Sequence, residues 1–394
     1  MMTNDYQTFD KTNVFNTYAR YPITLVKGEG AYVWDIHGKK YLDFLSGISC
    51  TSLGHCHPTI TAAIIKQAQT LLHTSNLYYS PPSIELAKFL IEHGGLDKIF
   101  FCNSGAEANE AAIKLARKYH WRKGAKNKNV ILSVDHSFHG RTFAALTATA
   151  KPAIQEGFAP LPLGFKYEDW DDIHKFCQAI DENVAAVIIE PIQGEGGIHV
   201  APPGLLEAVR TACDKTGALL IFDEVQCGLG RTGELFAYQY FKVKPDIITL
   251  AKGIANGLPL GAMCATEQAA TGFALGDHGT TFGANPVSCS AAFANLTTLI
   301  DDHYLAKIKQ LSAYLLASLQ NLQKKYPQAI KEIRGVGLMI GVELSVDAKK
   351  VLQHCQESGL LANVTADNVL RLLPPYVIEK SDIDFAVDVI AKTL

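Results

Sequence analysis

The sequence predicts an α/β protein in which a mostly parallel β-sheet lies between helices and a smaller α+β unit follows. From about residue 84 to residue 265, short apolar runs alternate with helical patterns, as in successive βαβ units. The apolar runs are continuous, which is typical of strands buried on both faces of a sheet. After about residue 290 the alternation gives way to longer helices and short strands.

Composition narrows the class of protein. The chain has 394 residues, too many for one compact core, so we expect two domains or one elaborated domain. It is 48% hydrophobic, and its net charge of −3 gives no support for nucleic-acid or membrane binding. No apolar run is long enough to span a membrane, and the polar start argues against a secretory signal. Nine scattered cysteines without CxxC spacing favour a reducing cytoplasm.

Residues 1–50 are expected to form an N-terminal segment that packs with the C-terminal unit. Its strand-like pieces are Ile23 to Val26, Ala31 to Trp34 and Lys40 to Leu45. The tripeptide His55-Cys56-His57 suggests a metal site, but adjacent side chains point in different directions and no second ligand pair stands nearby. We therefore interpret it as a turn into a helix, whose apolar face is Ile60, Ile64, Ala68 and Leu71.

Residues 51–290 are expected to form the large domain and residues 291–394 the small α+β domain. Strand-like runs in the large domain are Ile99 to Cys102, Val130 to Val134, Val184 to Ile189, Ala218 to Phe222, Ile247 to Ala251 and Gly261 to Ala265, with helical patterns at Ala108 to Tyr119 and Leu205 to Thr216. The small domain begins with an amphipathic helical pattern from Tyr304 to Lys325. The strand-like GLMIGVEL, the helical DAKKVLQHCQ, the strand-like VLRLL and a helix from Ser381 follow.

Two neighbouring apolar runs in the stretch from Gly217 to Gly253 end in charged residues. Asp223 and Glu224 directly follow the first run, and Lys252 directly follows the second. Ligands of parallel sheets bind beyond the carboxyl ends of the strands. A desolvated lysine can form a Schiff base with a carbonyl, and an aspartate facing a pyridinium nitrogen is the protein's share of pyridoxal phosphate chemistry. Taken alone, the pattern is equally compatible with two unrelated surface charges.

Two loops add signals for phosphate. Ser104 and Glu107 form a capping box at a helix start, where free N–H groups and the dipole favour an anion, and the small Gly105 and Ala106 would admit a phosphate. The polar loop HGTTFG contains Thr281, which could donate a hydrogen bond to the same phosphate. Most capping boxes bind nothing, and the second loop alone is compatible with a plain surface loop.

Two further loops follow predicted strands. In FHGR, Phe138 could stack on a planar ring and Arg141 could pair with a carboxylate, although a core phenylalanine and a surface arginine are the commoner interpretation. In EPIQGEGG, residues 190–197, three glycines and two acids are more than a connection needs.

Eight stretches, in order over nearly the whole chain, carry a family resemblance. They are FCNSGAEANEAAIKLARKY, FHGRT, EPIQGEGG, LLIFDEVQCGLGRTG, PDIITLAKG, HGTTFGANP, IRGVGLMIGVEL and VLRLLPP. Together they resemble the class III pyridoxal-phosphate aminotransferases. The resemblance implies the fold-type-I architecture, with a seven-stranded, mostly parallel sheet between helices in the large domain. It also implies pyridoxal 5'-phosphate as cofactor, no metal, and a homodimer.

The resemblance also implies a role for each candidate residue. Those expected to hold the cofactor are Ser104, Gly105 and Ala106 at its phosphate, Phe138 and Val225 on the faces of its ring, Asp223 at the ring nitrogen, Gln226 at the phenolic oxygen, Lys252 as the Schiff-base lysine that then moves the proton, and Thr281 at the phosphate from the partner subunit. Those expected to bind substrate are Arg141 with Tyr18 at its carboxylate, Thr280, and a Glu195–Arg371 pair that opens when a dicarboxylate enters.

Three positions leave alternatives open. Arg371 interrupts an apolar run, where a charge is costly unless paired, but it could also form a structural ion pair or face solvent. Ala284 stands where the family usually has a second glycine, and Asn256 where it has a Gly-rich turn. Both departures bear on loop geometry and substrate range rather than on the cofactor.

The reaction that the resemblance implies is transfer of the δ-amino group of N2-acetylornithine to 2-oxoglutarate, a step of arginine biosynthesis. Ornithine, succinylornithine, 4-aminobutyrate and succinyl-diaminopimelate stay open as amine substrates, because the ring chemistry is identical for all of them. A cofactor-binding protein without turnover is the alternative from another class, and the intact Lys252, Asp223 and Arg141 argue against it.

Overall fold

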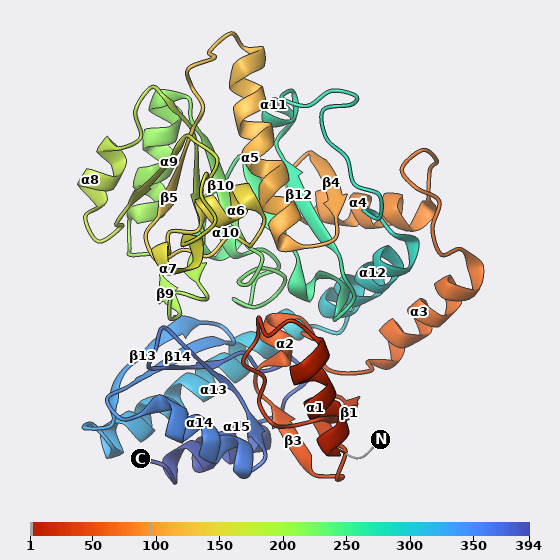
Figure 1. Ribbon diagram of the computed structural model, residues 1–394, viewed down its shortest axis with the longest axis vertical. Coiled ribbons are helices and arrows are strands. Elements are labelled where there is room, and N and C mark those ends of the chain that lie inside the picture. Colours follow the sequence, from red (N-terminus) through yellow and green to blue (C-terminus); the bar gives the residue numbers. More distant parts are fainter. Residues whose placement is uncertain (1–2, 95) are drawn as a thin grey trace.

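A seven-stranded sheet organises the larger body of the chain (Figure 1), for which a computed structural model describes residues 3–94 and 96–394. From one edge to the other its strands are β4 (Lys98–Cys102), β12 (Gly261–Ala265), β11 (Ile247–Leu250), β10 (Leu219–Asp223), β7 (Val184–Ile189), β5 (Val130–Val134) and β6 (Phe165–Glu168). Strand β12 runs antiparallel to both of its neighbours, and the remaining neighbours pair in parallel. The predicted mostly parallel, seven-stranded sheet is confirmed.

Sequence patterns located six of these strands to within one residue at each end, but not β6. That strand reads Phe-Lys-Tyr-Glu, lies at the edge of the sheet, and is only partly buried. An edge strand needs no continuous apolar run, so the signal that identified the other strands is absent from it.

Alternate residues of the strands pack on opposite faces of the sheet. Ile221 and Ile247 belong to a cluster with α5 (Gly105–Arg122). Leu220 and Phe222 belong to the cluster on the other face. Each such fully buried side chain stabilises the fold by roughly 1.5–3 kcal/mol, which is why both faces of these strands are apolar.

The remaining elements of the larger body connect and cover these strands. They are α3 (Pro58–Thr70), α4 (Pro81–Gly94), α6 (Phe143–Ala148), α7 (Pro152–Gln155), α8 (Ile173–Gln178), the hairpin of β8 (Ile192–Gln193) and β9 (His199–Val200), α9 (Leu205–Thr216), α10 (Ala237–Phe241), the 3-10 helix η1 (Lys252–Ala255), α11 (Glu267–Ala270) and α12 (Pro286–Asp301).

Both ends of the chain build the second body, which lies below the first in Figure 1. One antiparallel sheet has the order β13 (Ile330–Val336), β14 (Met339–Leu344), β17 (Val369–Leu372) and β16 (Asn363–Thr365). Another has the order β1 (Leu25–Glu29), β2 (Tyr32–Asp35), β3 (Lys40–Asp43) and β15 (Leu360–Leu361). Its helices are α1 (Thr3–Asn13), α2 (Ser46–Ser49), α13 (Tyr304–Lys325), α14 (Ala348–Glu357) and α15 (Lys380–Ala391). Pairing of β3 with β15 joins the N-terminal strands to the C-terminal part of the chain.

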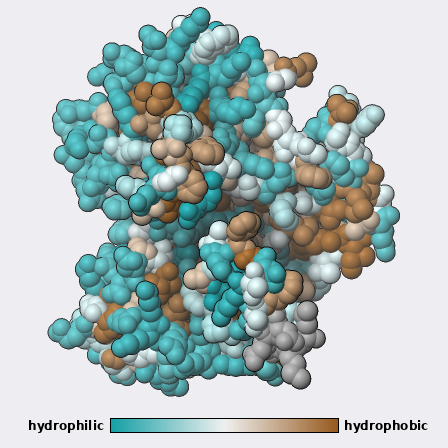
Figure 2. All heavy atoms as spheres, viewed as in Figure 1, coloured by the Kyte–Doolittle hydropathy of each residue, from teal (hydrophilic) through white to brown (hydrophobic). Residues whose placement is uncertain are grey.

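Two predicted helices differ in how they bury their apolar faces. Helix α13 spans the predicted residues and buries its stripe from Ile308 to Leu322. In α3, by contrast, Ile60 is the one buried residue. Most of the apolar face predicted for this helix is therefore exposed or only partly buried in the single chain. Figure 2 shows a hydrophobic patch over the region of α3 in Figure 1.

Asp223 and Glu224 are adjacent at the end of β10 but have different surroundings. The Glu224 carboxylate accepts the backbone N–H groups of Ala237, at 2.6 Å, and Tyr238, at 2.8 Å, at the start of α10. Burial raises the pKa of Glu224 to about 8, although the two N–H donors act in the opposite direction. Glu224 therefore caps the start of α10, whereas Asp223 lines the cavity described below.

Replacing Glu224 should change how stability depends on pH. Because its pKa is raised from 4.5 to about 8, the folded state binds a proton more tightly than the unfolded chain. The free energy of unfolding that Glu224 contributes therefore falls as the pH rises across this range, and Glu224→Gln should show a smaller fall in Tm from pH 5 to pH 8 than the unaltered protein. Glu207→Gln, at an exposed position of α9, is the control. An unaltered slope in Glu224→Gln would contradict this prediction.

Candidate active site

A cavity of about 420 Å³ opens at the carboxyl edge of the seven-stranded sheet. Its walls come from segments that follow β4, β5, β7, β10 and β11, as expected for a parallel sheet. The sequence-predicted residues that line it are Ser104, Gly105, Ala106, Phe138, Arg141, Asp223, Val225, Gln226 and Lys252.

Lys252 lines this cavity as the first residue of η1, directly after β11. Its backbone is left-handed, with φ of +46°, a conformation that costs a non-glycine residue about 1 kcal/mol or more and that clusters at functional sites. Its ammonium group has no hydrogen-bond or ion-pair partner among the residues that the structure describes. The Lys252 amine is therefore available at the cavity to react with or bind a ligand.

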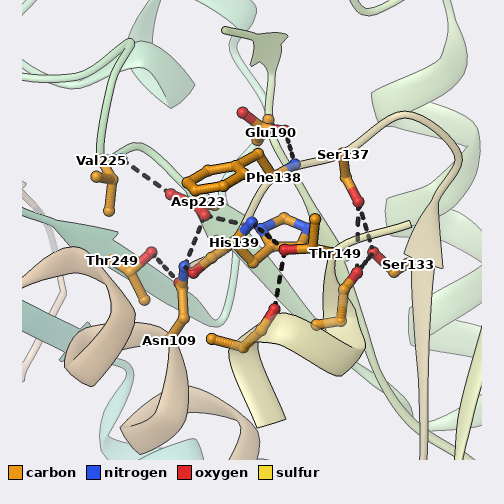
Figure 3. Close-up of polar contacts among 12 residues, drawn as sticks. Asn109, Ser133, Ser137, Phe138, His139, Thr149, Glu190, Asp223, Val225 and Thr249 are labelled. Atoms are coloured by element: carbon orange, nitrogen blue, oxygen red, sulfur yellow. Dashed lines mark hydrogen bonds and ion pairs between the residues drawn. The ribbon is translucent and has the colours of Figure 1, made fainter. Parts of the chain in front are cut away.

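The Asp223 carboxylate is nearly buried and is held by three donors (Figure 3). Its Oδ2 accepts from Asn109 Nδ2 at 2.7 Å and from His139 Nδ1 at 2.8 Å. Its Oδ1 accepts the Val225 N–H at 3.0 Å. These donors replace the water that a buried charge loses. The result is a fixed negative group at the wall of the cavity.

The start of α5 forms an anion cradle. Ser104 Oγ accepts the Glu107 N–H at 3.2 Å, which is half of the predicted capping box. Glu107 does not return to the Ser104 N–H but accepts the Asn103 N–H at 2.6 Å. Within the described part of the chain the N–H groups of Gly105 and Ala106 have no acceptor, so they remain free for an anion, with the helix dipole in their favour.

Glu190 connects two loops of the cavity. Its Oε2 accepts the Phe138 N–H at 2.9 Å and its Oε1 accepts the Gly194 N–H at 3.2 Å. Burial raises its pKa to about 7. One of the two acids in the EPIQGEGG loop therefore fixes the backbone of the aromatic residue. Arg141 is exposed, with its guanidinium carbon 5.7 Å from the centre of the Phe138 ring.

Arg371 pairs with the second acid of that loop, Glu195. Arg371 is fully buried on β17, which excludes a solvent-facing arginine. Its guanidinium also donates to Gln226 Oε1 at 3.1 Å and to Asn363 Oδ1 at 3.0 Å. Burial opposes ionisation of Glu195, but the charge and hydrogen bond of Arg371 outweigh it and lower the Glu195 pKa. Through Gln226 this pair is joined to the wall of the cavity.

Three predicted residues lie apart from the cavity in the single chain. Tyr18 is 74% exposed and lies beside a separate cavity of about 570 Å³ lined by residues 6–24. Thr280 Oγ1 accepts from Asn103 Nδ2 at 3.0 Å, at the edge of the site. Thr281 is exposed. The described contacts do not join Tyr18 to Arg141.

Sequence reasoning missed several residues of the site. They are Asn109, His139, Glu190, Thr249 and Lys151, whose Nζ donates to the Glu195 carbonyl at 2.9 Å. Thr249 is a polar residue in an otherwise apolar strand, whereas His139, Glu190 and Lys151 lie in loops and Asn109 lies in a helix of mixed composition. The signal at Thr249 identifies burial but not the partner, because the partner comes from another element.

Both departures from the family pattern have left-handed backbones. Asn256 has φ of +46°, and its amide accepts the Leu53 N–H and donates to the Gly54 carbonyl, each at 2.9 Å. Asparagine tolerates this conformation and here adds two hydrogen bonds. Ala284 has φ of +63°, where glycine carries no steric cost.

The arrangement fits pyridoxal 5'-phosphate. The free N–H groups of the cradle match a phosphate, the fixed Asp223 carboxylate matches a pyridinium nitrogen, and the Lys252 amine matches an aldehyde. Among the residues described, no group of three His, Cys, Asp or Glu side chains could hold a metal ion, and His55 instead pairs with Asp43 at 2.8 Å. Across residues 3–94 and 96–394 no helix is both long and apolar enough to cross a bilayer.

Comparison with known sequences identifies close relatives. The profile of the family described as Aminotransferase class-III matches residues 14–394. The acetylornithine aminotransferase of Methanocaldococcus jannaschii is 50% identical over 384 residues, which cover 98% of this chain and 96% of that protein. The enzyme of the same name from Caldanaerobacter subterraneus is 49% identical over 388 residues and 98% of each chain.

Solved structures show the same architecture. The ornithine aminotransferase of Toxoplasma gondii superposes with a TM-score of 0.96 at 36% identity, covering 100% of this chain and 95% of that one. A second structure of that enzyme has pyridoxal phosphate at partial occupancy in its active site. The acetylornithine aminotransferase of Elizabethkingia anophelis superposes with a TM-score of 0.89 at 32% identity, covering 99% of this chain and 98% of that one.

Filling the cradle should weaken cofactor binding. A methyl group at Gly105 would lie 2.7 Å and 2.9 Å from the two Val225 methyl carbons, closer than side chains approach. In Gly105→Ala either Val225 or the helix start must move, so affinity for pyridoxal phosphate should fall about 10-fold, since overpacking costs about 1–3 kcal/mol. Titration of the apo-protein measures the Kd, and circular dichroism checks the fold. An unaltered Kd would show that the start of α5 does not hold the phosphate.

Proposed function

Because the chain belongs to the class-III aminotransferases, we propose that it transfers the δ-amino group of N2-acetylornithine to 2-oxoglutarate. The observation that supports this most directly is the convergence of Lys252, Asp223 and the α5 cradle on one cavity. The relatives at 50% and 49% identity are acetylornithine aminotransferases, whereas the similar ornithine aminotransferase is 36% identical. We also propose a cytoplasmic location, where the nine thiols, all free in the structure, would stay reduced.

In this proposal the cofactor would be held at five points. The cradle of Ser104, Gly105 and Ala106 takes its phosphate, and Asp223 pairs with its ring nitrogen. The two faces of the ring lie against Phe138 and Val225, and Gln226 reaches its phenolic oxygen. Lys252 Nζ would bond to its aldehyde carbon, from which the carbonyl oxygen leaves as water. When bound, pyridoxal phosphate supplies an electron sink for the carbon that loses a proton.

The side chains of the cavity would then orient substrate and move a proton. Lys252 Nζ, once the substrate amine has displaced it from the aldehyde carbon, would take the proton from the amine-bearing carbon and return it during transfer. The carboxylate of the amine substrate would bind Arg141 together with Tyr18 of the N-terminal segment, and Thr280 would contact the substrate. Because Asp223 is charged, the ring nitrogen keeps its proton.

The Glu195–Arg371 pair would let one cavity serve two substrates in turn. The δ-amine end of acetylornithine carries no negative charge, so it fits beside a neutralised Arg371. In 2-oxoglutarate a carboxylate stands next to the reacting carbon and can replace Glu195 on Arg371. The Glu195–Arg371 ion pair supports this part of the proposal, because the exchange would begin from such a pair.

A homodimer is part of the proposal. The patch around α3 includes Ile65, Leu71, Leu72, Leu77, Tyr78 and Tyr79, all exposed in the single chain. A contiguous exposed apolar surface of this kind marks a protein contact. Such a dimer could bring Thr281 to the phosphate of the partner's site. The division into an N-terminal segment to residue 50, a large domain to residue 290 and a small domain is also proposed, and the pairing of β3 with β15 supports it.

A panel of single half-reactions tests the function. The holoenzyme is mixed with acetylornithine, succinylornithine, ornithine or 4-aminobutyrate, and the cofactor absorbance is followed in a single turnover. Acetylornithine should react with the highest kcat/KM, and Lys252→Ala should abolish turnover with every substrate. A faster reaction with another amine would reassign the donor. No reaction with any amine or with glutamate would indicate a cofactor-binding protein without turnover.

Arg371→Ala should separate the two half-reactions. The 2-oxoglutarate half should slow about 100-fold, since loss of a buried charge contact costs about 2–5 kcal/mol, while the acetylornithine half should be largely retained. Glu195→Ala should instead speed the reaction with glutamate relative to acetylornithine. Single-turnover spectra measure both. Equal damage to both halves in Arg371→Ala would leave only a structural ion pair.

Mixed dimers should test the role of Thr281. Subunits inactivated by Lys252→Ala are combined with subunits inactivated by Thr281→Ala, and exchange is verified by native mass spectrometry. A mixed dimer has one site in which the lysine and the partner's threonine are both intact, so up to half of the activity per dimer should return. If exchange occurs without recovery, Thr281 does not act across the interface.

A further inference from the structure

Asn109 lies where three parts of the cavity meet. It stands four residues after the first residue of α5, within the helix that begins with the cradle. It contacts Asp223 on β10 and Thr249 on β11, three residues before Lys252. Asp223 and Thr249 are register partners in the sheet. Asn109 is 1% exposed, so its side chain depends on protein partners rather than on water.

Each polar atom of the Asn109 side chain has a partner. The Nδ2 group donates to Asp223 Oδ2 and to the His139 carbonyl, both at 2.7 Å. The Oδ1 atom accepts from the Thr249 hydroxyl, also at 2.7 Å. Figure 3 shows Asn109 between Asp223 and Thr249. A flipped amide would place its oxygen against the Asp223 carboxylate and the His139 carbonyl, so these two acceptors define its orientation, and the Thr249 hydroxyl holds the amide there by donating to Oδ1.

This orientation determines which oxygen of Asp223 is available. Oδ2 already accepts from Asn109 and His139, whereas Oδ1 accepts only the Val225 N–H among the described residues. A carboxylate oxygen accepts about two hydrogen bonds. The unused acceptor site is therefore on Oδ1, and Asp223 lines the cavity.

We propose that Asn109 is a positioning residue which, held in place by Thr249, fixes Asp223 so that Oδ1 meets the ring nitrogen of pyridoxal phosphate. This inference rests on the proposed function, because that function supplies the ring. One amide then links the helix of the phosphate cradle, the strand of the aspartate and the strand of the lysine. A shift of any one of these elements would change the distance from Asp223 to the ring, and buried hydrogen bonds to a charged group resist such shifts.

Thr249→Val gives the sharpest test because it keeps the shape of the side chain and removes only the hydroxyl. Holoenzyme is loaded with pyridoxal phosphate labelled with 15N in the ring, whose resonance differs between a protonated and a neutral nitrogen. We expect a protonated ring in the unaltered protein and a shift toward the neutral position in Thr249→Val and Asn109→Ala. The kcat should fall about 10- to 100-fold, as expected for loss of a buried hydrogen bond near a charge, with KM changed far less.

Two further variants make the test specific. Thr249→Ser restores the hydroxyl and should recover both the resonance and kcat. Ser133→Ala removes a fully buried hydroxyl that donates to the Ala148 carbonyl at 2.6 Å and does not contact Asp223, so it should leave the resonance unaltered. An equal shift of the 15N resonance in Ser133→Ala would show that any lost buried hydroxyl loosens the site, and it would overturn the inference.

The inference and the function fail in different ways. If the unaltered protein is an active aminotransferase with a protonated ring, and Thr249→Val keeps both that resonance and its kcat, Asn109 has no positioning role. If the unaltered protein does not bind pyridoxal phosphate through Lys252, the proposed function itself is wrong. Should Asn109→Ala fail to fold, Thr249→Val and Thr249→Ser carry the test by themselves.

Discussion

A nearly buried carboxylate at the end of β10 is the constraint on which the site depends. A charge that is 3% exposed is costly unless donors replace its water, and Asp223 obtains them from three separate segments. Asn109 comes from α5, His139 from the loop after β5, and the Val225 N–H from the turn after β10. Meeting this one requirement ties β10 to the start of α5 and to the loop that carries Phe138, and Asn109 extends the connection to Thr249 on β11.

Three other acidic side chains that lose water on folding are each stabilised by different partners. Glu224 is held by the start of a helix, and burial raises its pKa to about 8. Glu190 ties two loops by their backbone N–H groups, with a pKa of about 7. Glu195 has a lowered pKa, because Arg371 more than offsets its burial. Only this last arrangement keeps a charged acid and a charged base together, as an exchangeable ion pair needs.

The position of Arg371 follows from how the second body is assembled. Strand β17 lies between β14 and β16, and the N-terminal strands join the same body through β15. The C-terminal body thereby presents Arg371 to Glu195 and Gln226 of the larger body. Helix α3 and the residues that follow it keep apolar side chains exposed in the single chain.

The sequence by itself determined the class of fold, six strands of the main sheet and the charged residues at their carboxyl ends, because continuous apolar runs and strand ends are local patterns. Family motifs added the cofactor and the candidate residues, including the Glu195–Arg371 pair. Tertiary structure decided that Asn109, held by Thr249, hydrogen-bonds to Asp223, whereas Glu224 hydrogen-bonds to the start of α10. It also decided that β6 and most of the apolar face of α3 are only partly buried or exposed. Those outcomes depend on which elements meet across the fold, and a hydrogen-bond partner more than 100 residues away leaves no periodic trace in the chain.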